Sequence, residues 1–245
     1  MRFYEFLKKF SFSHSKDDDN LAEFQRKINY NFKDKKLLIA ALTHSSYKNK
    51  DGISAFERLE FLGDSVLGLV VADMLFNEFP MNQEGKLSKK KSKLVSRKML
   101  SLKGKELHLE KYLYLGDGTL EKNGDVSPTI IGNAMESIIA AIYLDSNIDE
   151  ASKFINSFIL KNFEQMLTDT ILKNYKSILQ EYVQAKMSTL PTYRIISQRG
   201  PEHKKIFTVS VVIDGKEMSI AEGESKKKAQ QAAAKKVCEK LNLTQ

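Results

Sequence analysis

The 245-residue chain has no tryptophan, a single cysteine and no apolar run of membrane-spanning length. With Cys238 alone it can build neither an internal disulfide framework nor a cysteine-rich zinc site. Its longest apolar runs, such as Ile138–Leu144, fall far short of the roughly 20 residues that cross a bilayer. The N-terminus also lacks the uninterrupted apolar core of a signal peptide. These absences predict a cytoplasmic protein without a membrane partner.

Two common catalytic motifs are also missing. The four histidines, at positions 14, 44, 108 and 203, form no HExxH pair. The segment Gly116–Gly118 is too short for a glycine-rich loop that cradles phosphates. A zinc hydrolase and an enzyme with a nucleotide cofactor are therefore disfavoured.

Positive charge is what the chain has in excess. The net charge is +8 and the isoelectric point about 9.3, which favours nucleic acid or another anionic surface as the partner. Residues 174–245 hold 13 lysines and arginines against 7 aspartates and glutamates, and so carry most of this excess. The C-terminal part is thus expected to supply most of the electrostatic attraction.

Three carboxylates recur at helical spacing near the first third of the chain. Glu57, Glu60 and Asp64 stand at i, i+3 and i+7, so they share one face of a helix. The helix continues through the apolar stretch Val66–Val71, which indicates that it lies inside a domain. Clustered buried carboxylates need a counter-charge, and a hard divalent cation such as Mg²⁺ provides one. The alternative is an amphipathic helix whose carboxylates are solvated.

A second helix, predicted at residues 129–144, is apolar except at Asn133, Glu136 and Ser137. Asn133 and Glu136 lie three residues apart and therefore share a face. Glu136 alone could be a structural carboxylate with satisfied hydrogen bonds. If the two helices touch, it instead completes a metal site with the first carboxylate helix.

The pattern of the chain predicts an N-terminal extension, two domains and a linker. Residues 1–19 read as the extension, and 20–167 as an all-α domain. A polar linker at 168–174 precedes a small α+β domain at 175–245. The α-β-β-β-α order of the small domain rests on a helix at 175–187, strands at 192–198, 205–213 and 216–221, a hairpin signal at Asp214-Gly215, and a last helix capped by Ser225.

These motifs together resemble the ribonuclease III family, whose nuclease domain acts on double-stranded RNA. The segment Glu57–Ser65, ERLEFLGDS, is similar to the family's signature helix. Residues 43–46, 84–88 and 132–139 fall where the family has its other motifs. The C-terminal order resembles a double-stranded-RNA-binding domain. The resemblance covers about residues 20–243.

The resemblance implies a metal centre and a dimer contact. Glu60, Asp64 and Glu136 match metal-ligand carboxylates, with Asp64 and Glu136 central to catalysis, and the implied cofactor is Mg²⁺, for which Mn²⁺ could substitute. Glu57 and Glu84 match acidic residues near the cleavage site. Phe61 matches an aromatic side chain that fills a socket on the partner subunit of a homodimer. The alternative for Phe61 is an ordinary core residue.

The resemblance also implies how RNA is held. Such small domains read the shape of an A-form duplex across two minor grooves and the phosphates between them. The matching positions are Ser177, Gln180 and Gln184 on the first helix, His203 in a strand loop, and Lys226 and Lys227 at the start of the last helix. A basic run from Lys86 to Lys98 in the first domain is a further candidate for contacts with phosphates.

Asn133 departs from the family pattern, which has aspartate at this position in many members. An amide oxygen can still ligate a cation or orient a water, but it brings no negative charge. The resulting prediction is an endoribonuclease that hydrolyses double-stranded RNA. The resemblance further implies products with 5′-phosphate and 3′-hydroxyl ends, and rRNA and mRNA precursors as substrates. The alternatives are a double-stranded-RNA-binding protein with a degenerate metal site, and a structural or ribosome-associated helical protein.

Overall fold

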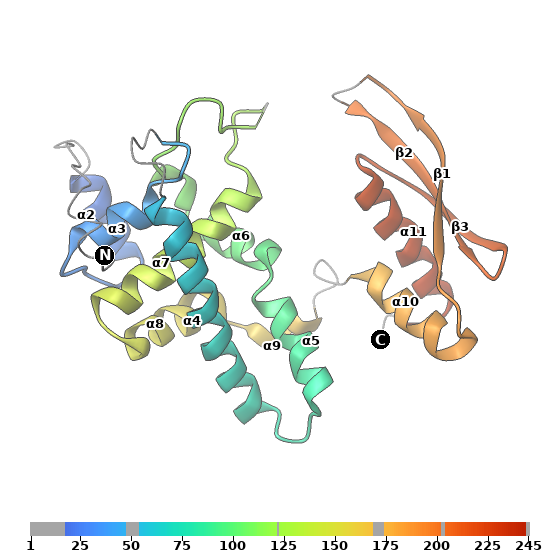
Figure 1. The fold of residues 1–245 in the computed structure, drawn as a ribbon, viewed down its shortest axis with the longest axis horizontal. Coiled ribbons are helices and arrows are strands. Elements are labelled where there is room, and N and C mark those ends of the chain that lie inside the picture. The colour runs from blue at the N-terminus through green and yellow to red at the C-terminus, as the bar shows by residue number, and fades with distance from the viewer. Residues whose placement is uncertain (1–17, 48–53, 122, 169–173, 202–203, 244–245) are drawn as a thin grey trace. The chain divides into compact units, whose positions relative to one another are not determined.

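The computed structural model describes residues 18–47, 54–121, 123–168, 174–201 and 204–243 (Figure 1). The chain divides into two compact units, Met1–Leu172 and Lys173–Gln245. Most of the predicted extension and linker lies outside the described residues. Within the described ranges, every helix is too short or too polar to span a membrane.

The first unit is helical, as the sequence predicts. Two isolated β-bridges, Thr43–Tyr114 and Leu120–Val126, join segments between its helices. The helices are α2 (Asp18–Lys27), α3 (Lys35–Leu42), α4 (Ala55–Glu78), α5 (Glu84–Leu94), α6 (Arg97–Glu106), the short η1 (Leu109–Lys111), α7 (Pro128–Asp145), α8 (Ile148–Phe154), the π-helical η2 (Ile155–Ile159) and α9 (Phe163–Thr168).

Side-chain caps fix where several of these helices begin. Ser54, Ser96 and Ser127 each accept a hydrogen bond from the backbone N–H three residues on, at the starts of α4, α6 and α7. Helix α2 begins at Asp18, two residues before the predicted start of the all-α domain at residue 20. Helix boundaries are the least certain part of a sequence reading, since end residues fray.

Helix α7 lies at the centre of the first unit, with α4, α6 and α3 packed against it (Figure 1). Its residues from Ala134 to Ile142 are buried almost completely. The Asp145 carboxylate at its end accepts hydrogen bonds from the Tyr30 hydroxyl at 2.8 Å, the Lys33 N–H at 2.9 Å and the Asp34 N–H at 2.8 Å. These bonds fix the loop between α2 and α3 to the central helix.

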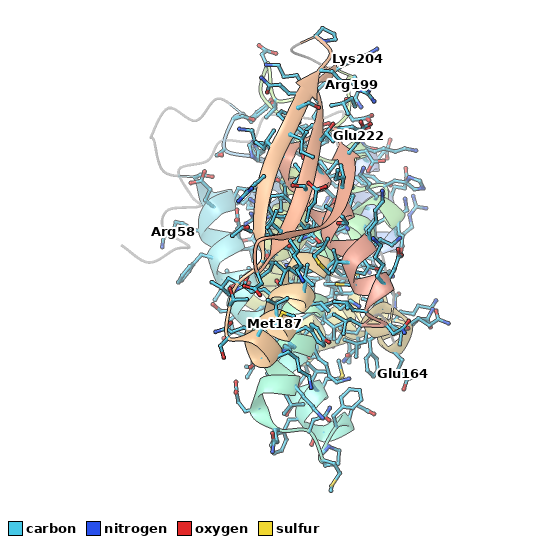
Figure 2. The ribbon with its side chains drawn as sticks, turned by 90° about the vertical axis from the view of Figure 1, so that its right-hand side faces the viewer. Arg58, Glu164, Met187, Arg199, Lys204 and Glu222 are labelled. Atoms are coloured by element: carbon cyan, nitrogen blue, oxygen red, sulfur yellow. The ribbon has the colours of Figure 1, made fainter. Side chains whose placement is uncertain are left out.

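The second unit has the predicted α-β-β-β-α order. Helix α10 (Tyr175–Met187) precedes an antiparallel sheet of β1 (Thr192–Arg199), β2 (Ile206–Ile213) and β3 (Lys216–Gly223), and α11 (Lys226–Lys240) follows. Both residues of the Asp214-Gly215 turn have positive φ angles, 48° and 73°, as the hairpin signal requires. In Figure 2, Arg199 and Lys204 lie together at the tip of the β1–β2 hairpin. Met187, the last residue of α10, lies near the other end of the sheet.

The core of this small unit lies between the two helices and one face of the sheet. Leu179 and Val183 of α10 meet Val211 of β2 and Val237 of α11. All four are almost fully buried. The polar residues of α10 therefore face solvent on the other side of the helix.

Candidate functional site

The candidate site is built where α4 crosses α7 at Gly63. A Cβ atom placed on Gly63 would overlap the Glu136 carbonyl oxygen, so only glycine allows this backbone approach. A second contact comes from Ser137, whose hydroxyl donates to the Phe56 carbonyl oxygen at 3.0 Å. Because Glu60 and Asp64 flank Gly63 within one helical turn, the crossing brings them near Glu136.

The Thr43–Ser46 motif contacts the first turn of α4. The His44 Nδ1 atom lies 2.8 Å from the Ser46 hydroxyl oxygen, which also accepts from the Gly116 N–H at 3.0 Å. The His44 ring packs edge-on against Phe56, with ring centroids 5.2 Å apart. In this structure the motif supports the start of α4, next to the contact that Phe56 makes with α7.

Glu136 is the most perturbed carboxylate of the site. It is 6% exposed, and burial together with the negative charges of Asp64 and Glu60 raises its pKa to about 7. Burial also raises the pKa of Glu60, while the nearby Arg97 opposes that rise. A cation at this position would relieve the repulsion and favour the ionised form of both groups.

The Asn133 amide provides a further oxygen. Its side chain hydrogen-bonds to Glu60, which lowers the pKa of that carboxyl group. Its Oδ1 atom is buried and has no hydrogen-bond partner among the described residues. Since an unpaired buried acceptor is unfavourable, this oxygen fits a site that a cation or a water completes.

The donor chemistry of the site suits a hard divalent cation, because all of these groups offer oxygen. However, no three His, Cys, Asp or Glu side chains among the described residues converge closely enough to hold a metal ion. The residues are therefore neighbours with the right chemistry, but not a closed set of ligands.

The expectation that α4 lies inside the domain holds for only one face of the helix. Glu57 and Asp64 are exposed, and Glu60 is only partly buried. The exposed face of the helix also carries Phe61 and Leu69, which are 78% and 61% exposed. An exposed apolar face has the same composition as a buried one, so the sequence pattern could not separate them.

Glu57 and Glu84 lie at helix starts rather than inside the carboxylate group. Glu57 is in the first turn of α4, where its backbone N–H donates to the Ser54 hydroxyl at 3.3 Å, and its charge raises the pKa of Glu60. Glu84 begins α5, and its carboxylate accepts from the Ser88 hydroxyl at 2.6 Å. Of these two glutamates, Glu57 is the one whose charge affects the pKa of a proposed ligand.

Arg97 is a site residue that the sequence reading placed only within a basic run. Its guanidinium lies 4.0 Å from the Glu60 carboxylate, and its charge lowers the pKa of both Glu60 and Glu136. Two lysines of the same run make intramolecular contacts. Lys90 lies 3.8 Å from the centroid of the Phe79 ring, and Lys93 donates to the Leu167 carbonyl oxygen at 2.6 Å.

The second unit offers a polar helix face. Ser177, Gln180 and Gln184 of α10 are all exposed on the side away from the core. Asn174 caps this helix by accepting from the Ser177 N–H at 3.3 Å, and Gln231 of α11 donates to the same Asn174 oxygen at 2.6 Å. The position of α10 is thereby tied to α11. His203 lies outside the described residues.

Lysines begin α11, where Ser225 accepts a hydrogen bond from the Lys228 N–H at 3.1 Å. A Cβ atom on Gly223 would overlap the backbone at Ala229, so the end of β3 and the start of the helix are pressed together. Lys226 and Lys227 are exposed beside the helix N-terminus, and Lys228 pairs with Glu224. Exposed cations and backbone N–H groups therefore occur together at this end of α11, which suits phosphate.

Two family models match the chain. The model described as ribonuclease-III-like matches residues 34–163, and the double-stranded RNA binding motif matches residues 175–241. The proteins called Ribonuclease 3 in a Nitratiruptor species and in Campylobacter jejuni (serotype O:6) are each 40% identical. The matches cover 88% and 91% of this chain, and 94% and 98% of those proteins.

Solved structures agree over the first unit. Two structures of the ribonuclease III nuclease domain from Campylobacter jejuni are 39% identical, with TM-scores of 0.55 and 0.54. Each covers 59% of this chain, and 99% and 96% of the respective solved chain is matched. One of them is described by the structural flexibility of its region involved in dimer formation. The sequence motifs, the fold and the chemistry of the site thus agree with these comparisons.

Proposed function

The chain belongs to the ribonuclease III family and is an endoribonuclease for double-stranded RNA, and we propose that it uses Mg²⁺ held by Glu60, Asp64 and Glu136. The family is metal-dependent, and the choice of ion rests on the all-oxygen donor set. Mn²⁺ is the expected substitute. Asn133 is assigned to the same site through its amide oxygen.

The observation that carries the ligand assignment is the environment of Glu136. This carboxyl group is buried next to two other carboxylates, and its pKa is raised to about 7 as a result. A structural glutamate on an apolar helix would be expected to have a hydrogen-bonding partner of its own. The unpaired Asn133 oxygen beside Glu60 supports the same assignment.

Bound Mg²⁺ would lower the pKa of a water and offset charge on the scissile phosphate and on the leaving 3′ oxygen. Glu60, Asp64 and Glu136 would supply the negative charge that attracts the ion. Asn133 orients Glu60 through its amide hydrogen bond. We assign Glu57 and Glu84 supporting roles near the cleaved strand, since both are exposed at helix starts.

The second unit would hold the duplex. Ser177, Gln180 and Gln184 present hydrogen-bonding groups toward a minor groove, and Lys226 and Lys227 meet the phosphates of the major groove. Exposure of all five side chains is what supports this assignment. His203 is proposed as a further minor-groove contact from its place between β1 and β2.

We further propose that the enzyme is a homodimer in which Phe61 contacts the partner subunit. Phe61 is 78% exposed, and Leu69 and Phe76 are 61% and 70% exposed on the same helix. At 100° per residue these three positions fall within a quarter of the circumference of α4. Two active sites are needed to cut both strands of a duplex. Cytoplasmic precursors of rRNA and mRNA are the proposed substrates.

The test is cleavage of a labelled RNA duplex by wild type, Glu136→Ala and Glu164→Ala, in Mg²⁺ and in EDTA. Glu164→Ala is the control, because it removes an exposed carboxylate from α9. Glu136→Ala should lose cleavage in Mg²⁺ by at least about a hundredfold while binding the duplex in EDTA as wild type does, since most of the RNA contacts lie elsewhere. Cleavage of near wild-type rate by Glu136→Ala would refute its role as a ligand.

A further inference from the structure

Arg97 stands out because a cation lies beside a group of carboxylates that is proposed to attract another cation. Its Nη2 atom is 4.0 Å from Glu60 Oε1, and its side chain is 58% exposed. A charge-assisted hydrogen bond between such groups is shorter, about 2.7–2.9 Å. The pair is therefore an electrostatic contact without a closed hydrogen bond, and the guanidinium keeps access to solvent.

The backbone of Arg97 is held in place by α7. A Cβ atom on Gly132 would lie 2.9 Å from the Arg97 Cγ atom and 3.1 Å from its carbonyl oxygen, so the two helices touch at this glycine. Gly132 directly precedes Asn133 in the chain. The start of α6 is thus fixed next to the proposed metal site, while the end of the Arg97 side chain can reorient.

Arg97 does not serve the stability of its own helix. It is the first residue of α6, and the first turn of this helix contains no acidic residue. The N-terminal end of a helix carries partial positive charge, so a cation there is unfavourable. An anion near this position offsets that repulsion, and Glu60 provides one in the metal-free protein.

We propose that Arg97 is a positioning residue that exchanges partners: it pairs with Glu60 when no metal is bound, and pairs with an RNA phosphate when a divalent cation occupies the carboxylates. This inference rests on the proposed metal site. A cation that neutralises Glu60 removes the attraction that holds Arg97 there. The released guanidinium then adds a positive charge where the cleaved strand must lie, and couples metal binding to RNA binding.

The first measurement is Mn²⁺ binding in the absence of RNA. The amount of free Mn²⁺ is monitored by its electron paramagnetic resonance signal. Arg97→Gln should bind Mn²⁺ about three- to tenfold more tightly than wild type, because a competing cation has been removed. Glutamine keeps the Cβ and Cγ atoms that pack against Gly132. Lys98→Gln is the matched control, since it removes a charge from the next exposed position of the same helix, and should change Mn²⁺ affinity less than about twofold.

The second measurement is affinity for an RNA duplex in EDTA and in Ca²⁺, with gels to exclude cleavage. Arg97→Gln should weaken binding about fivefold in Ca²⁺ and less than about twofold in EDTA, because its phosphate contact requires an occupied site. Lys98→Gln should have the same effect under both conditions. Equal behaviour of Arg97→Gln and Lys98→Gln in both measurements would overturn the exchange.

A different result identifies failure of the proposed function itself. If wild type and Glu136→Gln bind Mn²⁺ equally, the carboxylates are not the metal site, and the exchange falls with it. If Glu136→Gln loses Mn²⁺ but Arg97→Gln matches wild type, the metal site stands and only the role of Arg97 is refuted. The two proposals are thus separated by one set of variants.

Discussion

At the scale of single residues, Asn133 is the position where the site has an amide in place of a carboxylate. Asn133→Asp adds a negative charge next to Glu60, so the Mg²⁺ concentration for half-maximal cleavage should fall several-fold. Asn133→Ala removes the oxygen and the hydrogen bond to Glu60 and should raise that concentration without abolishing cleavage. A Mg²⁺ titration of the cleavage rate for the three proteins makes the comparison.

The same titration separates the alternatives for this residue. Cleavage that appears only in Asn133→Asp, and never in wild type, would mean that the natural protein binds RNA without cutting it. Wild-type cleavage with unchanged Mg²⁺ dependence in both variants would mean that Asn133 takes no part in the metal site.

The Glu136 carboxylate is expected to lower the stability of the metal-free protein at high pH, although cleavage requires it. Its pKa is raised from 4.5 to about 7 by burial and by Asp64 and Glu60. Because the folded pKa lies above the unfolded one, stability falls as pH rises from about 4.5 to 7, and the loss is complete above pH 7. At 1.36 kcal/mol per pKa unit, the rise from 4.5 to about 7 means that the ionised carboxylate costs roughly 3 kcal/mol.

Glu136→Gln should therefore raise the melting temperature in EDTA at pH 8 while cleavage is lost, and the gain should vanish near pH 4. Thermal unfolding of both proteins between pH 4 and pH 8 measures this difference in melting temperature. Glu164→Gln is the control, because Glu164 is exposed on α9 and lies outside the carboxylate group. A gain in Glu136→Gln that is the same at pH 4 and pH 8 would show that the carboxylate charge is not its cause.

The residues of this site were predictable to different degrees. Spacing and composition predict that Glu60, Asp64, Asn133 and Glu136 share helix faces, and the structure brings these helices together. Arg97 could not be found in this way, because its approach to Glu60 depends on the contact of α6 with Gly132. Contacts between distant segments leave no periodic signal in a sequence.

At the scale of helices and strands, Gly63 determines whether α4 and α7 can meet. An alanine within a helix is normally favoured over glycine by about 1 kcal/mol. At Gly63 the change from glycine to alanine should instead destabilise the protein, because the added Cβ would overlap the Glu136 carbonyl oxygen. Gly63→Ala should lower the unfolding free energy by several kcal/mol, or move the two helices apart and lose cleavage.

Gly85→Ala is the matched control for this prediction. Gly85 lies in α5, and no atom would lie within 4 Å of an added Cβ. The substitution Gly85→Ala should leave the unfolding free energy unchanged or raise it by up to about 1 kcal/mol. Chemical denaturation of both variants makes this comparison. A Gly63→Ala protein as stable and active as Gly85→Ala would contradict the tight crossing.

The lysines at the start of α11 are expected to contribute to the salt dependence of RNA binding. If Lys227 contacts a phosphate, Lys227→Ala should weaken duplex RNA binding and reduce the slope of log affinity against log salt by about one. Lys216, exposed at the β2–β3 turn, provides a control lysine of the same unit. Equal slopes for wild type and Lys227→Ala, measured by filter binding, would exclude the contact.

The element boundaries show what local sequence determines. The turn at Asp214-Gly215 and the cap at Ser225 agree with expectation, because both depend on neighbouring residues. Helix α4 extends seven residues beyond the predicted apolar stretch, to Glu78. Its last turns are stabilised by Leu75, which is buried in the core, so packing rather than pattern sets the length.

At the scale of the whole molecule, the exposed apolar face of α4 predicts assembly. Phe61, Leu69 and Phe76 leave a large apolar surface on a single chain, and such surfaces mark interaction sites. The alternative of Phe61 as an ordinary core residue is wrong, because its side chain is 78% exposed. Truncating it should therefore cost little folding stability in the monomer, unlike the roughly 3–5 kcal/mol typical of a core phenylalanine.

Phe61→Ala should weaken dimerisation by at least about tenfold and reduce cleavage at low protein concentration, while the melting temperature of the monomer stays near that of wild type. Met81→Ala is the control, because Met81 is 93% exposed at the turn after α4 and lies outside that helix. Sedimentation velocity at nanomolar to micromolar concentration gives the dissociation constant, and cleavage across the same range shows whether activity follows the dimer. If Phe61→Ala dimerises as tightly as Met81→Ala, the contact lies elsewhere on the molecule. If it forms monomers that still cut both strands at the wild-type rate, two facing active sites are not required.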